Sequence, residues 1–171
     1  MGSSKATKKF VYVTLLSAMA IAINMIESAF VVGMPFGIRF GFANIIALIT
    51  IELFSEKEMI TVNLMRVLIG NLMRGTIFGS TFWISSGGVI LSTIVLILVR
   101  KLLKLEIYSN SMLCAVAHSI GQVFVVMFIY KQTAMFTIVP ILLISSIPTG
   151  ILTGWIAKEA LNRLDKEKLM R

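Results

Sequence analysis

The sequence is poor in the residues that form disulfides, metal centres and water-exposed surfaces. Its 171 residues include one cysteine, Cys114, and one histidine, His118. A single cysteine excludes an intrachain disulfide, and the two residues cannot supply a multi-cysteine or histidine-rich metal site. Only 14% of the residues are charged, whereas a soluble domain carries about 25%. We therefore expect no metal, no cofactor, and a chain whose solvent is largely lipid.

Carboxylates are also scarce, which bears on catalysis. Asp165 is the only aspartate, and the glutamates are scattered at positions 27, 52, 56, 58, 106, 159 and 167. Prenyl diphosphate chemistry uses Mg²⁺, a hard cation that is held by clustered carboxylate oxygens, and the sequence has no such cluster. The phosphate-binding pattern G-x-x-x-x-G-K-[ST] is missing too, so any ATP must be hydrolysed by another chain. The sequence predicts that the protein is not an enzyme.

Hydrophobic residues, by contrast, are abundant and come in long runs. They make up 57% of the chain, and the mean hydropathy is +0.93. A membrane-spanning helix needs about 20 mostly apolar residues. Because backbone polar groups must be paired internally in lipid, each run is expected to be a helix. The six predicted spans are 10–26, 35–54, 59–78, 82–99, 112–130 and 136–157.

Positive charge is distributed unevenly between the two sides of these spans. The net charge is +8, which in a soluble protein would suggest nucleic acid as a partner. Here the basic residues flank apolar spans, so orientation in lipid explains them better and we expect no nucleic-acid partner. One side carries Lys5, Lys8, Lys9, Lys57, Arg100, Lys101, Lys104, Lys158, Arg163, Lys166, Lys168 and Arg171, and the other only Arg39 and Lys131. Positive residues stay in the cytoplasm, which places both termini there.

The expected fold is therefore an all-α membrane protein, a bundle of six transmembrane helices with both termini cytoplasmic. Residues 1–9 would form a cytoplasmic N-terminal tail and residues 10–157 the six-helix transmembrane domain. Residues 158–171 would form a charged cytoplasmic tail that extends the last helix. The expected location is the cell (plasma) membrane of a bacterium, as a multi-pass protein surrounded by membrane lipid.

The third predicted span carries a polar stripe that is costly in a membrane. Each charge there costs about 2.5–3.5 kcal/mol even on a mild insertion scale. Steps of three and four residues place the stripe on one helical face; it comprises Asn63, Arg66, Gly70 and Arg74, with Asn71 beside it. One interpretation is an anion site, because guanidinium forks match carboxylate and phosphate oxygens. The other is structural pairing, of Arg66 with Glu52 or of Arg74 with Glu27.

Two further polar features have open interpretations. His118 and Gln122 lie four residues apart on one face of the fifth span, where they either contact a neighbouring helix or touch a ligand. The segment 33–41 has three glycines and a proline, which disfavour a regular helix. It forms either a close-packing stripe or a mobile outer loop that carries Arg39 as a lid over a site.

Ala18 and Ala22 form a small-xxx-small pair in the first span. Such pairs let two helices approach closely. The pair serves either internal helix packing or docking to another membrane subunit.

Several segments together resemble a known family. The segments 37–44 (GIRFGFAN), 66–70 (RVLIG) and 117–122 (AHSIGQ) are similar to the Gx transporter family, often labelled heptaprenyl diphosphate synthase component I. The chain also resembles the substrate-binding S components of energy-coupling factor (ECF) transporters in its six short spans, its cytoplasmic termini and its segment 16–22 (LSAMAIA) with the alanine pair. The resemblance extends from about residue 10 to residue 157.

The resemblance implies an S component that captures a small anionic vitamin or precursor from outside. It would work with a transmembrane scaffold subunit and two ATPase subunits, with Ala18 and Ala22 meeting the scaffold. Polarity alone selects the candidate substrate-binding residues, which are Arg39, Asn44, Asn63, Arg66, Asn71, Arg74, His118 and Gln122. Two alternatives stay open: a self-contained ion-coupled small-molecule carrier, and a non-catalytic membrane partner of a prenyl diphosphate synthase.

Overall fold

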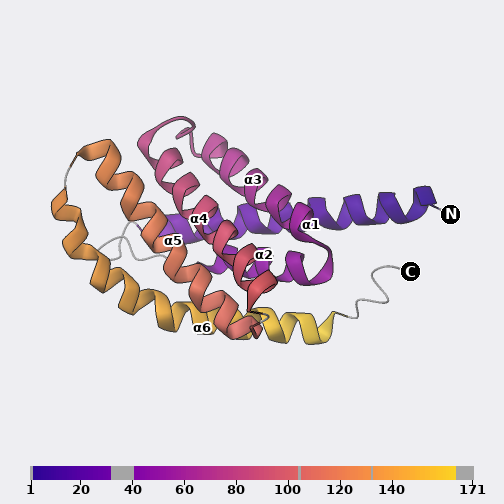
Figure 1. Cartoon of the computed structure of the whole chain (residues 1–171). Helices are drawn as coiled ribbons and strands as arrows, with labels where there is room; N and C mark the ends of the chain where they lie inside the picture. Colours follow the sequence, from indigo (N-terminus) through magenta and orange to yellow (C-terminus); the bar gives the residue numbers. More distant parts are fainter. Residues whose placement is uncertain (1, 32–40, 104, 132, 165–171) are drawn as a thin grey trace.

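The computed structural model describes residues 2–31, 41–103, 105–131 and 133–164. Within these ranges the chain forms α-helices and a short 3-10 helix and contains no strand (Figure 1). The elements are α1 (Gly2–Val31), α2 (Phe42–Leu53), α3 (Glu56–Met73), α4 (Ser80–Leu102), α5 (Ile107–Tyr130), η2 (Thr133–Ile138) and α6 (Val139–Arg163). The all-α prediction and the order of six helices are confirmed. Arg39 and most of the segment 33–41 lie outside the described residues.

Four helices are long and apolar enough to cross a membrane. They are α4, α5, the Lys5–Ala29 part of α1 and the stretch Phe136–Arg163 that contains α6. The chain is thus a multi-pass membrane protein. The 12 residues of α2 extend only about 18 Å, short of a hydrocarbon core about 30 Å thick. The crossing of the membrane by α2 and α3 stays a prediction, as does the cytoplasmic location of the termini.

Several helix boundaries differ from the predicted spans. α3 ends at Met73, whereas the apolar run suggested a span to Phe78. Gly75 adopts φ +67° directly after the helix, a left-handed conformation that commonly ends helices. At the N-terminus, α1 begins at Gly2, so the described part of the predicted tail 1–9 is helical and continuous with the first span. At the other end, α6 continues to Arg163, as the predicted helical extension requires.

The short helix α2 lies at the centre of the bundle. Ten of its 12 residues are buried, and it contacts α1, α3, α5 and α6. Its side chains Leu48 and Ile51 belong to the largest hydrophobic cluster, together with Leu96 of α4 and Ala157 of α6. Burial on all sides explains why the sequence of α2 is almost uniformly apolar.

The connection between α2 and α3 is short and polar. Ser55 precedes α3 in an extended conformation, and its hydroxyl donates to the carboxylate of Glu58. This Ser-x-x-Glu spacing is typical of a helix start. Glu56 and Glu58 also place negative charge in the first turn, where the helix dipole favours it. Lys9 of α1 forms an ion pair with Glu58, which fastens α1 to this end of α3.

Glycines let α4, α5 and α6 pack closely. A methyl group built on Gly121 of α5 would lie 2.5 Å from the carbonyl oxygen of Gly87 in α4. A methyl group on Gly150 of α6 would lie 2.6 Å from Cα of Met112 in α5. These distances are too short for a side chain, so the three helices depend on glycine at the crossings.

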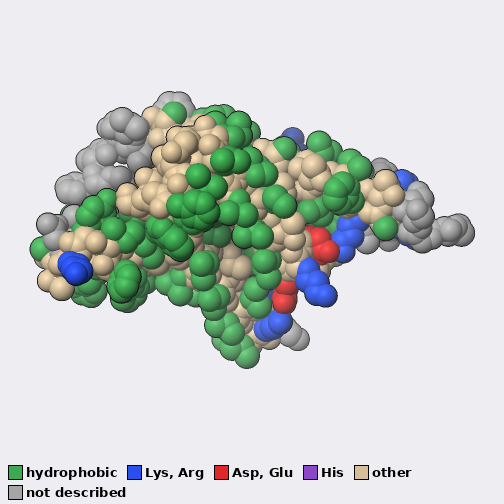
Figure 2. Space-filling view, turned by 90° about the horizontal axis from the view of Figure 1, so that it is seen from above, with side chains coloured by type: hydrophobic (Ala, Val, Ile, Leu, Met, Phe, Trp, Pro, Cys, Tyr) green, Lys and Arg blue, Asp and Glu red, His purple; other side chains and the backbone are tan. Residues whose placement is uncertain are grey.

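Charge is concentrated at one end of the molecule. The beginning of α1 and the end of α6 lie at the same end (Figure 1), and most of the visible Lys, Arg, Asp and Glu side chains gather there (Figure 2). Ion pairs join Lys9 to Glu58, Arg100 to Glu52, Lys101 to Glu56, Lys158 to Glu106 and Arg163 to Glu159. Hydrophobic side chains cover much of the rest of the described surface in this view. This arrangement suits a molecule with one polar end in water and an apolar body in lipid.

Candidate substrate-binding site

The polar stripe predicted on α3 faces the interior of the bundle. Arg66 and Asn71 are 2% and 0% exposed, and Asn63 and Gly70 are also buried. Arg74, at the end of the helix, is half-buried. The side chains of the opposite face, such as those of Leu64 and Leu72, are largely exposed. The helical spacing therefore identified the inward face of α3 correctly.

Arg66 reaches across to α2 in the middle of the bundle. Its Nη1 donates to Oδ1 of Asn44 at 3.2 Å. Asn44 lies in the first turn of α2, which begins after Gly41 in the left-handed region with φ +71°. The structure thus brings together two of the predicted site residues. Glu52, the suggested structural partner of Arg66, instead forms an ion pair with Arg100 of α4 at 3.4 Å.

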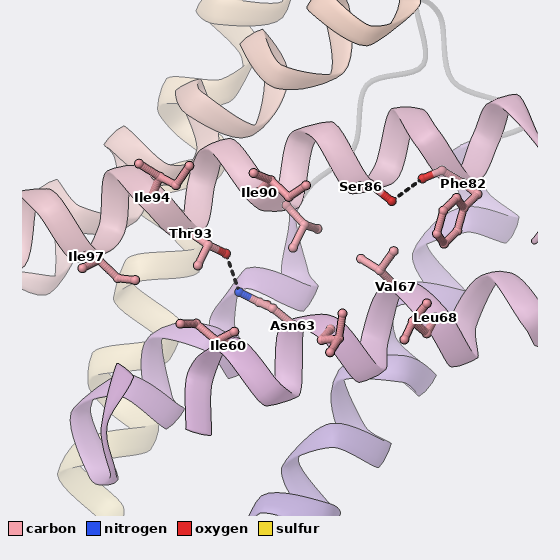
Figure 3. A pocket seen from close by; sticks show the side chains of 12 residues that line it. Ile60, Asn63, Val67, Leu68, Phe82, Ser86, Ile90, Thr93, Ile94 and Ile97 are labelled. Atoms are coloured by element: carbon pink, nitrogen blue, oxygen red, sulfur yellow. Dashed lines mark hydrogen bonds between the residues drawn. The ribbon is translucent and has the colours of Figure 1, made fainter. Parts of the chain in front are cut away.

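Asn63 connects α3 with α4. Its Nδ2 donates to Oγ1 of Thr93 at 2.9 Å and lies 3.2 Å from Sδ of Met59 (Figure 3). Its Oδ1 has no hydrogen-bond partner. A cavity of about 10 Å³, lined in part by Asn63, Asn44 and Cys114, lies between the helices. A cavity of this size holds a single water molecule at most.

Arg74 is held at the other end of the stripe by neutral groups. Its Nε donates to the carbonyl oxygen of Gly70 at 3.0 Å, and its Nη2 donates to Oδ1 of Asn71 at 3.3 Å. Its Nη1 donates to the hydroxyl of Ser28 on α1. Asn71 in turn donates to the carbonyl oxygen of Val67 at 2.7 Å. These contacts fix the guanidinium group between α1 and α3.

The α1 side of this site was not identified from the sequence. Asn24 faces Gly70, Ser28 contacts Arg74, and Glu27 is only 6% exposed. Glu27, the suggested partner of Arg74, accepts a hydrogen bond from the backbone N–H of Gly41. Steps of three and four residues place Asn24, Glu27 and Ser28 on one face of α1. This spacing is the feature of the sequence that could have identified the three residues.

A family model described as heptaprenyl diphosphate synthase component I matches residues 16–160. The chain belongs to this family. The resemblance drawn from the three segments is confirmed. No curated protein and no solved structure matches the chain.

His118 and Gln122 lie where α5 contacts α4. A methyl group built on Gly88 would lie 2.8 Å from Cε1 of His118 and 2.8 Å from Cγ of Gln122. Both side chains therefore pack against a bare stretch of α4 backbone. This geometry favours the helix-contact interpretation, while contact with a ligand stays a prediction.

Ala18 and Ala22 lie on the outer face of α1. Both are exposed, whereas Ala20 between them is 0% exposed and Ser17 is 7% exposed. Among the described residues, the alanine pair thus does not serve packing inside the bundle. An exposed strip of small side chains is what close approach of another helix requires.

Proposed function

We propose that the protein is the substrate-binding S component of an energy-coupling factor type importer. It captures a small anionic vitamin or precursor from outside. The observation that carries this proposal is the placement of Arg66 and Arg74 on the inward face of α3, two helical turns apart. Membership of the heptaprenyl diphosphate synthase component I family is compatible with this role.

The electrostatics of the bundle favour an anion at this place. A charge attracts its partner more strongly in a low-dielectric interior than in water. The amide of Asn44 and the hydroxyl of Ser28 orient the two guanidinium groups before any ligand arrives. Groups that are already oriented lose less entropy on binding. An anion with two acceptor ends would use both arginines.

The energy for import would come from other chains. The sequence has no phosphate-binding loop, so we propose a transmembrane scaffold subunit and two ATPase subunits as partners. The exposed alanines 18 and 22 on α1 are the proposed docking surface for the scaffold. Positive charge is concentrated at the end of the molecule where α1 begins. We therefore propose that this end faces the cytoplasm and that the opposite end faces outward.

Ligand-detected thermal shift tests the anion site. A panel of vitamins, quinone precursors and isoprenoid phosphates would be screened on the purified chain, and affinities then measured for Arg66→Lys and Arg74→Lys. Lysine keeps the charge but loses the planar fork. We expect affinity losses of about tenfold to hundredfold, since a hydrogen bond to a charged group contributes about 1.5–3 kcal/mol. Arg163→Lys, on the exposed end of α6, is the control. Unchanged affinity in both α3 variants would disprove the anion site.

A non-catalytic membrane partner of a prenyl diphosphate synthase is the second candidate. Membership of a family described as a component of heptaprenyl diphosphate synthase supports this role. In this role we propose that the catalytic Mg²⁺ site lies on the synthase subunit and that this chain contributes no catalytic group.

Affinity purification from the native host separates the candidates. Recovery of a scaffold and two ATPases supports the importer. Recovery of a prenyl diphosphate synthase subunit supports the partner role. A lone homodimer with ion-driven flux supports the self-contained carrier.

A further inference from the structure

The beginning of α2 is contacted by two buried side chains of opposite charge. Glu27 of α1 and Arg66 of α3 are 6% and 2% exposed, and they are the charged side chains that are buried among the described residues. Oε1 of Glu27 accepts a hydrogen bond from the backbone N–H of Gly41. Nη1 of Arg66 donates to Oδ1 of Asn44 at 3.2 Å. Both charges therefore act on about one turn of the same helix end.

The same stretch of α1 also contacts the second arginine. Ser28 follows Glu27 directly, and its hydroxyl accepts a hydrogen bond from Nη1 of Arg74. Oδ1 of Asn24 lies 3.6 Å from a methyl group built on Gly70 of α3. One face of α1 thus carries an amide, a carboxylate and a hydroxyl beside the polar stripe of α3.

The carboxylate of Glu27 is only partly paired. Within the described ranges the ion pairs involve other glutamates. Oε2 of Glu27 accepts no hydrogen bond there, and it is not one of the fully enclosed oxygens, such as Oδ1 of Asn63, that a ligand cannot reach. The N-terminus of α2 offers only about half an elementary charge. A buried carboxylate is costly unless it is paired, so Oε2 favours a ligand that brings a cation.

The position of Glu27 limits which anions the site can hold. An acidic group bound by Arg66 and Arg74 would lie near this carboxylate, and like charges disfavour each other in an interior that excludes water. A positive charge on the ligand removes this conflict. The acidic group then binds the arginines, while a protonated amine donates to Oε2 of Glu27.

We propose that the ligand carries a protonated amine together with its acidic group, and that Glu27 is the residue that selects for this amine. The inference rests on the proposed function, because the two arginines hold the acidic end of the ligand. It goes beyond that function by naming the ligand class, which is amino carboxylates or amino phosphates instead of simple acids. The hydrogen bond from Gly41 keeps the carboxylate oriented while Oε2 binds the amine.

Matched probes that differ only by an amine test this proposal. The full chain in a maltoside detergent would be titrated with O-phosphoethanolamine against ethyl phosphate, and with 4-aminobutyrate against butyrate. We expect the member with the amine to bind about ten- to hundredfold more tightly, as a hydrogen bond to a charged group allows. Glu27→Gln keeps an acceptor for Gly41 but loses the charge, so it should bring this ratio close to one. Glu159→Gln, at an exposed position of α6, is the control and should keep the ratio.

The role of Glu27 and the anion site fail in different ways. Arg66→Lys should weaken the binding of all four probes and leave the ratio within each pair unchanged. Equal affinities of the wild type for paired probes, or an equal change of both affinities in Glu27→Gln, would overturn the role of Glu27. The anion site stands in that case as long as Arg66→Lys weakens binding.

The wild-type ratio tests the proposal even if Glu27→Gln does not fold, because it needs no variant. Absence of binding by all four probes would also overturn the role of Glu27. The panel of vitamins, quinone precursors and isoprenoid phosphates then decides the anion site by itself.

Discussion

Arg66 of α3 and Asn44 of α2 share a hydrogen bond of 3.2 Å between two buried side chains. The contact joins the first turn of the short central helix to the middle of its neighbour. A charged donor and an amide acceptor interact strongly where water is excluded. The pair therefore serves two purposes, since it fixes α2 against α3 and orients a cation inside the bundle.

Removing the amide of Asn44 should destabilise the protein. Asn44→Leu has similar volume but leaves Arg66 without this acceptor. The expected loss is about 1.5–3 kcal/mol, the range for hydrogen bonds to charged groups. Thermal unfolding in detergent measures it, and Asn162→Leu at an exposed position of α6 is the control. Equal melting temperatures for wild type and Asn44→Leu would contradict the structural role of the contact.

Replacing the same amide with a carboxylate should separate stability from ligand binding. Asn44→Asp keeps an acceptor for Arg66 and adds a negative charge beside it. Because the guanidinium then has an anionic partner within the chain, we expect near-normal folding but weakened binding of an external anion. The thermal-shift assay with the identified anion measures this. Retention of full anion affinity would show that Arg66 is not part of the site.

A methyl group at the crossing of α4 and α5 should not be tolerated. In Gly121→Ala, Cβ would lie 2.5 Å from the carbonyl oxygen of Gly87, so the helices must separate. Overpacking of this kind costs about 1–3 kcal/mol. The matched control is Gly70→Ala, where the nearest atom is Oδ1 of Asn24 at 3.6 Å. It should melt at or above the wild-type temperature, because alanine favours a helix by about 0.5–1 kcal/mol over glycine.

The ion pair between Lys9 of α1 and Glu58 of α3 should weaken in acid. Burial raises the pKa of Glu58, but hydrogen bonds from Lys9 and Ser55 outweigh it and hold the pKa below its ordinary value of 4.5. A lowered folded-state pKa stabilises the fold above the unfolded value, and this stabilisation is lost as the pH falls through the folded one. Glu58→Gln removes the titration. Its melting temperature should fall less than that of the wild type between about pH 7 and about pH 3.5.

The exposed pair Arg163 and Glu159 supplies the control for this measurement. Glu159→Gln should show the same acid-induced fall as the wild type, since ion pairs on the surface contribute little. Identical pH dependence of the wild type and Glu58→Gln would show that the Lys9 contact does not contribute to stability.

Bulk on the outer face of α1 should affect assembly but not folding. Ala18→Leu and Ala22→Leu place their side chains outside the bundle, so the isolated chain should melt as the wild type does. Docking of a second membrane helix should fail, because close approach needs small residues. Co-purification of partner subunits from the native host measures this, with the exposed Ala134→Leu as the control. Undiminished recovery of a scaffold subunit by both variants would exclude this face.

Much of the fold was predictable because lipid imposes simple rules on sequence. Long apolar runs gave the six helices in the correct order, and charged residues at steps of three and four gave the inward face of α3. The end of α3 was not predictable from hydrophobicity, because Ile77 and Phe78 continue the apolar run into a turn. Only the left-handed conformation of Gly75 marks the boundary.

The partners of the site residues were harder to predict than the residues themselves. Arg66 and Asn44 were both selected by polarity, but their contact depends on how α2 and α3 pack. Glu52 was one suggested partner of Arg66, whereas Arg100, 48 residues further along the chain from Glu52, reaches that carboxylate.

The burial of ten of the 12 residues of α2 has a consequence for how the chain is made. A helix of 12 residues is too short to span a bilayer alone. The helices that pack against α2 include α5 and α6, which are synthesised much later. Until then its amide and hydroxyl groups, such as those of Asn44 and Thr50, lie in a half-built bundle. We therefore expect chains truncated before α6 to be degraded in the cell, because α6 is synthesised long after α2 and covers part of it.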